Sequence, residues 1–208
     1  SSELEVAAIL SEAKEPLSVA GGNTRVLAPS GSKIISTSKL SGVIDYEPGA
    51  LTMIAKAGTP LSEIQKTLTS EGQCLAFDPY NWSRFINKKG SSTIGGVFAA
   101  NVSGSSRLRV GAARDFLLGI RLVDGLGNII QNGGRVMKNV TGYDLVKLFA
   151  GSWGTLGILT EVSFKVLPKP ETEATIVIHG LNDQLALDAM IDATATPFDV
   201  SGLSLIHI

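Results

Sequence analysis

The sequence predicts an α+β fold in which short strands and amphipathic helices surround one core. Two helix signals carry this prediction: apolar residues at helical spacing after Ser2, and a Thr59-Pro60 start before a second apolar stripe. Short β-rich runs, separated by turn residues, lie between and after them. With 208 residues, 44% of them hydrophobic, the chain is long enough for one large domain or one domain and part of another.

The N-terminal half alternates strands with two helices. The first helix is expected over 3–15, with Ser2 as N-cap and Pro16 as its stop. The second begins with Thr59 as N-cap and Pro60 at the first helical position, and Gly72 lies past its end. Its apolar stripe is Leu61, Ile64 and Leu68. The expected strands of this half cover 17–20, 33–37, 43–46 and 51–56.

The C-terminal half has a helix expected over 95–101 and strands expected over 116–123, 128–131 and 160–167. Residues 124–127 contain the turn between the first two strands. Pro168 and Pro170 end the last strand and mark a domain boundary. We therefore expect one domain over 1–168 and the start of another over 169–208. That second part is expected to hold a strand over 175–178 and a helix over 183–191.

Composition excludes several classes of protein. A net charge of −1 without a clustered basic excess argues against a nucleic-acid binder. Apolar stretches are too short for a transmembrane span of ~20 residues. Cys74 is the only cysteine, which fits a reducing compartment, and it is either buried filler or a reactive thiol. His179 and His207 are too few for a metal cluster or a Ser-His-Asp site. No signal peptide opens the chain, which begins with Ser1 and is expected to be a fragment.

A glycine-rich loop follows the strand at 17–20. Successive main-chain N–H groups of Gly21, Gly22, Asn23 and Thr24 can form a concave anion nest suited to a pyrophosphate, and Asn23 tolerates the left-handed conformation. An ordinary tight turn is the alternative. The spacing differs from the Rossmann fingerprint, and no Walker A lysine follows.

Two more glycine clusters lie downstream. Gly95-Gly96 either presents free N–H groups at a helix start or allows close helix packing. A third cluster repeats glycine every third residue, at Gly151, Gly154 and Gly157. We expect the three clusters to converge on one long ligand. Between them, Arg107, Arg109 and Arg114 form either a solvated charged face or a phosphate clamp.

At these residues the chain resembles the FAD-binding domain of the vanillyl-alcohol-oxidase/p-cresol-methylhydroxylase (PCMH) type flavoproteins. The matching pieces are the Gly21–Thr24 loop, the Thr93-Ile94-Gly95-Gly96 turn, the run 114–119, and the block from Lys138-Asn139 through Gly157-Ile158 to Glu161. Within that superfamily the chain resembles the FAD-binding subunits of glycolate oxidase. Asn23 with Arg25, the run 134–140 and Trp153 carry this finer likeness, which extends roughly over 5–170.

The resemblance implies a two-subdomain PCMH-type FAD-binding domain over 1–168, followed by the truncated start of a cap domain over 169–208. FAD should be held non-covalently, because no His lies in or near the first loop. No metal site is expected. The expected cofactor-binding residues are Ala20, Gly21, Gly22, Asn23, Thr24, Pro79, Thr93, Gly95, Gly96, Asn101, Ser103, Gly104, Gly111, Asp115, Gly157 and Ile158. No catalytic base is named, since the cap is truncated. Tyr143 is expected to be buried with a partner, and Asp144 to cap the helix at 145–149.

The activity implied by the resemblance is hydride transfer from the α-carbon of a small 2-hydroxy acid, glycolate or D-lactate, to FAD. Its implied setting is a glycolate oxidase complex with a sister flavin subunit and an iron–sulfur subunit. That complex would be cytoplasmic, or peripheral at the inner membrane. One alternative is a UDP-N-acetylenolpyruvylglucosamine reductase-like enzyme on the same fold, against which the block 138–158 argues. Another is a flavin-free structural subunit, against which the intact glycines argue.

Overall fold

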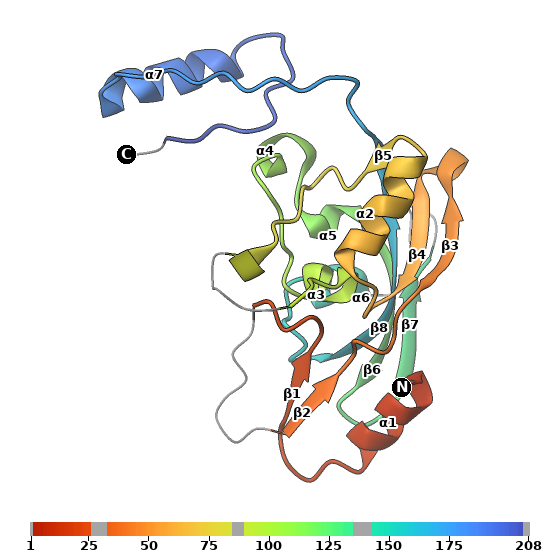
Figure 1. The fold of residues 1–208 in the computed structure, drawn as a ribbon. Coiled ribbons are helices and arrows are strands. Elements are labelled where there is room, and N and C mark those ends of the chain that lie inside the picture. The colour runs from red at the N-terminus through yellow and green to blue at the C-terminus, as the bar shows by residue number, and fades with distance from the viewer. Residues whose placement is uncertain (1, 26–32, 85–89, 135–142, 206–208) are drawn as a thin grey trace.

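A five-stranded antiparallel sheet forms the centre of the computed structural model, which describes residues 2–25, 33–84, 90–134 and 143–205 (Figure 1). The strand order is β3-β4-β8-β6-β7. These strands are β3 (Val43–Glu47), β4 (Thr52–Lys56), β6 (Leu117–Asp124), β7 (Ile129–Gly133) and β8 (Gly157–Lys165). Two small sheets flank it: the parallel pair β1 (Leu17–Ala20) and β2 (Lys33–Ser36), and the antiparallel pair β5 (Gln73–Cys74) and β9 (Leu167–Pro168). The predicted α+β class is confirmed.

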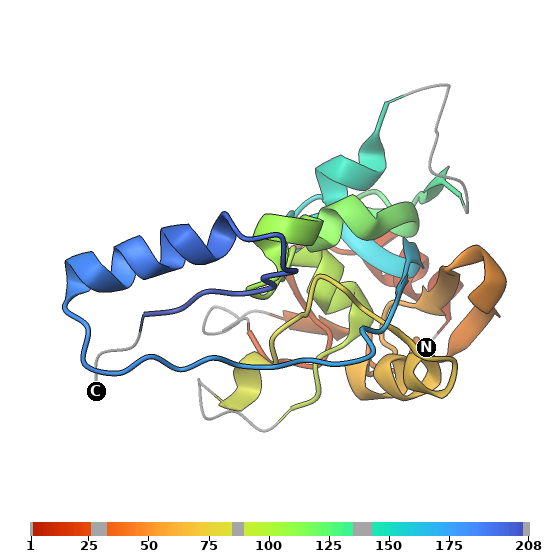
Figure 2. The same ribbon diagram turned by 90° about the horizontal axis from the view of Figure 1, so that it is seen from above.

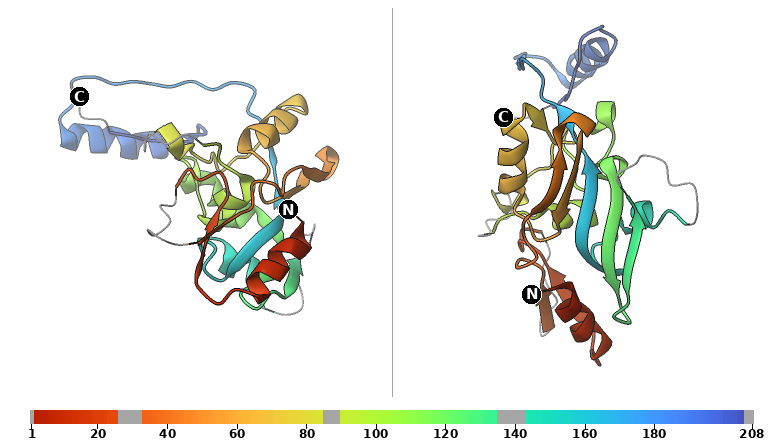
Figure 3. Two further views of the ribbon diagram at one scale, coloured as in Figure 1. Left: turned by 60° about the horizontal axis from the view of Figure 1, so that its bottom comes forward. Right: turned by 90° about the vertical axis from the view of Figure 1, so that its right-hand side faces the viewer.

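Short helices cover one face of the large sheet and enclose the main core (Figures 1 and 3). They are α2 (Leu61–Ser70), α3 (Ile94–Ala99), α5 (Ala113–Phe116) and α6 (Leu145–Phe149). The predicted stripe of Leu61, Ile64 and Leu68 is buried on α2. Phe98 of α3 packs against Phe77 and Phe164, so that α3 is fixed at the centre of the core. The remaining short elements are η1 (Pro48–Ala50), η2 (Trp82–Arg84) and α4 (Arg107–Val110).

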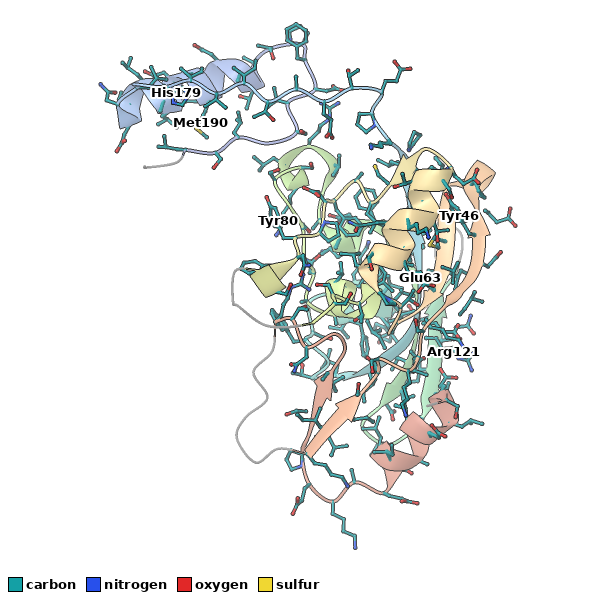
Figure 4. All side chains as sticks on the ribbon, viewed as in Figure 1. Tyr46, Glu63, Tyr80, Arg121, His179 and Met190 are labelled. Atoms are coloured by element: carbon teal, nitrogen blue, oxygen red, sulfur yellow. The ribbon has the colours of Figure 1, made fainter. Side chains whose placement is uncertain are left out.

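The first helix, α1 (Glu3–Ser11), packs against the opposite face of the sheet. Successive side chains of a strand point to opposite faces of the sheet, so neighbouring residues belong to different cores. Leu122 belongs to the main core, whereas Val123 joins Val6 of α1. The Glu3 carboxylate accepts hydrogen bonds from Arg121 Nε at 2.7 Å and from Thr160 Oγ1 at 2.6 Å. Figure 4 shows Arg121 just above α1. These bonds fix α1 on β6 and β8.

The predicted helix starts are confirmed for α1 and corrected for α2. Ser2 caps α1, and a bond from its own N–H to Glu5 completes a capping box. The helix ends at Ser11 rather than at 15, because Glu12, Lys14 and Glu15 offer no apolar side chain to the core. Thr59 is not the N-cap of α2, a position that Pro60 takes.

Thr59 instead ties the α2 entrance to the loop after β2. Its buried hydroxyl donates to Lys56 O at 2.7 Å and accepts from Gly42 N at 2.9 Å. Gly72 adopts φ +64 past the end of α2, as predicted. Further along, β8 begins at Gly157, before the predicted 160, and Pro168 pairs with Gln73 in β9.

The chain after β9 runs away from the sheet toward α7 (Asp183–Thr194), as Figures 1 and 2 show. The predicted helix at 183–191 is confirmed and is one turn longer. The strand predicted at 175–178 is wrong, because no described strand pairs with this segment. Ile176, Val177 and Ile178 are exposed. No helix in the described part of the chain is long and apolar enough to cross a bilayer.

Candidate functional site

One cavity brings segments from all three glycine clusters together. It holds about 740 Å³ of atom-free space, a volume that includes solvent at its open side. The loop after β1, the start of α3 and the start of β8 form its walls (Figure 1). Its lining residues are Val19, Ala20, Gly21, Gly22, Asn23, Thr24, Arg25, Thr37, Ala57, Thr93, Gly95, Gly96, Ala99, Ala100, Trp153, Gly154, Gly157, Ile158 and Leu159. The three clusters therefore lie together in space, as a shared ligand site requires.

The loop after β1 carries unoccupied hydrogen-bond donors at the cavity wall. The main-chain N–H groups of Gly21, Gly22, Asn23 and Thr24 donate to no residue that the structure describes. Asn23 adopts φ +54, so the chain turns through the left-handed region where a nest forms. A Cβ on Gly22 would lie 1.5 Å from Ser91 O, so only glycine fits against the neighbouring segment. This loop therefore matches the anion nest better than an ordinary turn.

Arg25 adds a positive charge beside these donors. Its Nη2 donates to Tyr80 O at 2.8 Å, whereas its buried Nε has no hydrogen-bond partner among the described residues. Burial lowers the pKa of Arg25 to about 10, and the side chain stays cationic at neutral pH. It is the one ionisable side chain among the described lining residues. An unpaired buried guanidinium nitrogen is costly unless an anion pairs with it.

The main-chain N–H groups at the start of α3 are hydrogen-bonded within the protein. This excludes the interpretation that Gly95-Gly96 presents free N–H groups. Ile94 N donates to Thr59 O at 2.9 Å, Gly95 N to Ala57 O at 2.8 Å, and Gly96 N to Thr93 Oγ1 at 3.3 Å. A Cβ on Gly95 would lie 2.5 Å from the Ala57 Cβ. Close packing, not ligand-facing N–H groups, therefore explains Gly95, whereas a Cβ on Gly96 would meet only the Thr93 hydroxyl at 3.1 Å.

The start of β8 presents an open strand edge to the cavity. Strand β4 ends at Lys56, which pairs with Glu161, and Ala57 N donates to Thr160 O at 2.8 Å. Before that point, residues 157–159 pair with β6 on one side. No described strand pairs with them on the cavity side. Their N–H and C=O groups can therefore meet the polar edge of a planar ring.

Several predicted site residues lie outside the cavity and hold α5 in place. Asn101 Oδ1 accepts from Arg114 N, and Ser103 Oγ accepts from Ala113 N, both at 2.9 Å. Asp115 accepts from Ala112 N at 2.8 Å. The predicted residues that do not line the cavity are Pro79, Asn101, Ser103, Gly104, Gly111 and Asp115.

The three downstream arginines do not line the cavity either. Arg109 pairs with Asp199, and Arg114 lies 3.9 Å from Asp115. Arg107 is exposed. These contacts support a solvated charged face rather than a phosphate clamp.

The structure also bears on predictions for single residues outside the cavity. Asp144 caps α6, accepting from Lys147 N at 3.1 Å. The burial predicted for Tyr143 is wrong, since its side chain is 87% exposed. Burial raises the pKa of the Cys74 thiol, which favours a protonated filler over a reactive group. The block from Lys138 to Gly142 and most of the run 134–140 fall outside the described residues.

The sequence did not assign Arg25, Thr37, Ala57 or Trp153 to the site, whereas Gly154 belonged to the third glycine cluster. Two of these residues carried a usable signal. Arg25 directly follows the predicted nest, and Trp153 is a large aromatic residue placed between Gly151 and Gly154. Ala57 and Thr37 gave no signal, because they reach the cavity only through the pairing of distant strands.

Comparisons with known proteins agree with this geometry. The family described as FAD binding domain matches residues 1–133. Glycolate oxidase subunit GlcE of Escherichia coli (strain K12) is 36% identical over 91% of this chain and 53% of its own length. Glycolate oxidase subunit GlcD of Bacillus subtilis (strain 168) is 33% identical over 90% of this chain and 37% of its own. The chain thus spans about half, or less, of the length of these relatives.

A structural likeness supports the same fold. A solved alkyldihydroxyacetonephosphate synthase matches with a TM-score of 0.63 at 22% identity, covering 82% of this chain and 30% of that protein. At this level of identity the match concerns the fold alone. D-lactate dehydrogenase of Anaerostipes hadrus is similar in sequence, at 29% identity over 88% of this chain and 38% of its own length.

Proposed function

Because the chain belongs to the family of FAD binding domains, we propose that it is the FAD-binding part of a glycolate oxidase-type oxidoreductase acting on 2-hydroxy acids. When bound, FAD would supply the hydride acceptor for oxidation of glycolate, or D-lactate, to the 2-oxo acid. The observation that carries the proposal is the cavity, where a nest of free N–H groups and a cation meet the open edge of β8.

The residues present fit a dinucleotide with a diphosphate. The N–H groups of residues 21–24 and the unpaired Nε of Arg25 would hold the phosphates. Gly157 and Ile158, at the open edge of β8, would hold a ring through main-chain groups. The remaining predicted residues that line the cavity, Ala20, Thr93, Gly95 and Gly96, would shape the wall between the phosphate site and the ring site. A bound dinucleotide would thus satisfy donors that are otherwise left unpaired in this wall.

We propose that FAD is held without a covalent bond. No His, Cys or Tyr is found among the described lining residues, and those side chains are the ones able to form such a bond. None of the described lining residues is a base at neutral pH, so the proposal assigns no catalytic base to this cavity.

The proposed setting is a complex with a sister flavin subunit and an iron–sulfur subunit that takes up the electrons. The word "subunit" in the names of the two glycolate oxidase relatives supports an assembly. Its proposed location is the cytoplasm, or the inner-membrane surface through that complex.

Visible absorption of the purified chain with added FAD tests the cofactor. A two-banded flavin spectrum that survives desalting and enters the supernatant after acid precipitation is expected. Colour in the pellet would contradict the non-covalent link, and a chain that stays colourless after addition of FAD would overturn the cofactor itself. Arg107 lies outside the cavity, so the Arg107→Met variant should bind FAD normally and serves as a control for a cavity variant such as Arg25→Met.

The substrate is tested on the intact complex rather than on this chain alone. Anaerobic addition of glycolate or D-lactate should bleach the flavin bands, with one 2-oxo acid formed per flavin reduced. A complex whose flavin is bleached by dithionite but by no 2-hydroxy acid would overturn the proposed substrate class, while leaving the cofactor in place.

A further inference from the structure

Trp153 is a lining residue of the cavity that the proposed binding of FAD leaves without a role. Its side chain is 51% exposed, so burial of the indole contributes little to folding. Its backbone adopts φ +56, a region in which a bulky residue is strained. Folding alone therefore gives no reason for a tryptophan at this position.

Hydrogen bonds fix the strained backbone. Trp153 N donates to Ala99 O at 2.9 Å, and Ser152 N donates to Phe149 O at 3.1 Å. Thr155 Oγ1 donates to Ser152 O at 2.6 Å. Glycine or asparagine would satisfy the same backbone with less strain, because both adopt positive φ readily. The side chain, not the turn, is thus what requires explanation.

The place of Trp153 in the cavity wall supplies that explanation. Trp153 and Gly154 lie just before the open edge of β8 at 157–159. Val19, Ala99 and Ala100 add apolar surface to the same cavity. A ring that meets the strand edge through its polar atoms needs a flat apolar surface against its face, and an indole provides one.

We propose that Trp153 is the stacking platform for a heteroaromatic ring of the bound dinucleotide, either the adenine or the isoalloxazine. The proposal rests on the proposed binding of FAD in this cavity. Five described non-glycine residues have positive φ: Asn23, Leu51, Asp78, Asn101 and Trp153. Asn23 and Trp153 line the cavity, one at the proposed phosphate site and the other at the proposed ring site.

The first experiment separates ring binding from a structural role, since the two make opposite predictions for one variant. Trp153→Asn relieves the backbone strain, and its melting temperature without FAD should rise by about 2–4 °C. Its Kd for FAD should nevertheless increase on the order of tenfold. Trp153→Phe keeps a flat ring and should bind FAD within about threefold of the natural chain. Trp82→Phe changes the only other tryptophan and is the reference variant, with its own melting temperature and FAD Kd measured beside those of the Trp153 variants.

The second experiment identifies the ring. In the Trp82→Phe variant, Trp153 is the only tryptophan, and ADP absorbs no light at its emission wavelength. Quenching of its emission by ADP places adenine on Trp153. If the isoalloxazine lies there instead, flavin emission excited in its visible absorption band should be stronger for FAD bound to Trp153→Phe than for FAD bound to Trp82→Phe.

The outcomes are distinct. An unchanged FAD Kd in Trp153→Asn, with FAD still bound, overturns the platform and leaves the proposed function standing. A melting temperature that falls together with FAD affinity points to a structural role and also overturns it. Failure of the natural chain to bind FAD overturns both proposals. The platform is supported by weaker FAD binding in a more stable Trp153→Asn chain, with one of the two rings then identified by emission.

Discussion

The loop after β1 and the start of α3 both carry a glycine pair at the same cavity, but their main-chain N–H groups differ in whether the protein itself hydrogen-bonds them. Those of residues 21–24 donate to no described residue, whereas those of Ile94, Gly95 and Gly96 are all used within the protein. At Gly21, Gly22 and Gly95 a Cβ would collide with a neighbouring segment. A glycine pair therefore indicates close approach of a backbone, and the N–H groups decide whether a ligand can be bound.

The largest effect is expected on stability, at the tightly packed Gly95. In Gly95→Ala the new Cβ would lie 2.5 Å from the Ala57 Cβ and 2.7 Å from Ala57 O. Since neither neighbour is a flexible side chain, we expect the free energy of unfolding without FAD to fall by about 3 kcal/mol. Urea unfolding measures this loss. Gly49→Ala, where the new Cβ meets nothing within 4 Å, is the control, and equal losses in the two variants would refute the packing explanation.

The next effect is expected on the affinity for FAD. Arg25→Met removes the cation beside the free N–H groups and should weaken FAD roughly 10- to 100-fold, as expected for a charge-assisted bond. Riboflavin, which has no phosphate, should lose little affinity. Isothermal titration of both ligands measures the difference. An equal loss for riboflavin would show that Arg25 shapes the cavity through Tyr80 rather than binding phosphate.

A smaller effect is expected at Asn23, whose positive φ forms the nest. Asn23→Ala should lower the free energy of unfolding by about 1 kcal/mol, because alanine is strained in the left-handed region. Asn23→Gly should keep both stability and FAD affinity. Thermal melts with and without FAD compare the three chains. A fully stable Asn23→Ala protein would argue that this turn does not hold the left-handed conformation.

The smallest effect is expected at Gly96. A Cβ there would lie 3.1 Å from the Thr93 hydroxyl, and alanine favours a helix over glycine. The two effects should nearly cancel, leaving the free energy of unfolding within about 0.5 kcal/mol of the natural chain. Urea unfolding beside Gly95→Ala shows whether adjacent glycines of one helix differ as the contacts require.

Local signals predicted the fold well where chemistry and periodicity agreed. The α1 cap at Ser2 and the buried stripe of α2 followed from the residues alone. The prediction that Thr59 is the N-cap of α2 was wrong because its hydroxyl accepts a hydrogen bond from Gly42 N, which is far away in sequence. The strand expected at 175–178 failed because β-propensity needs an edge to pair with, and no described strand offers one.

The site was predicted in part for the same physical reason. Gly21, Gly22 and Gly157 were found because glycine spacing is visible in one sequence. The fate of an N–H group depends on tertiary contacts, such as that between Gly95 N and Ala57 O, and no local pattern shows these. The strain at Trp153 is a property of the folded backbone, which no local sequence pattern shows.

Amide hydrogen exchange, followed by NMR residue by residue with and without FAD, shows whether the loop after β1 binds the phosphates. Without FAD, the amides of residues 21–24 should exchange quickly and those of Gly95 and Gly96 slowly. FAD should slow the first group strongly and change the second little. If bound FAD leaves the amides of residues 21–24 as fast as before, the loop after β1 is not where the phosphates bind, and the account is wrong.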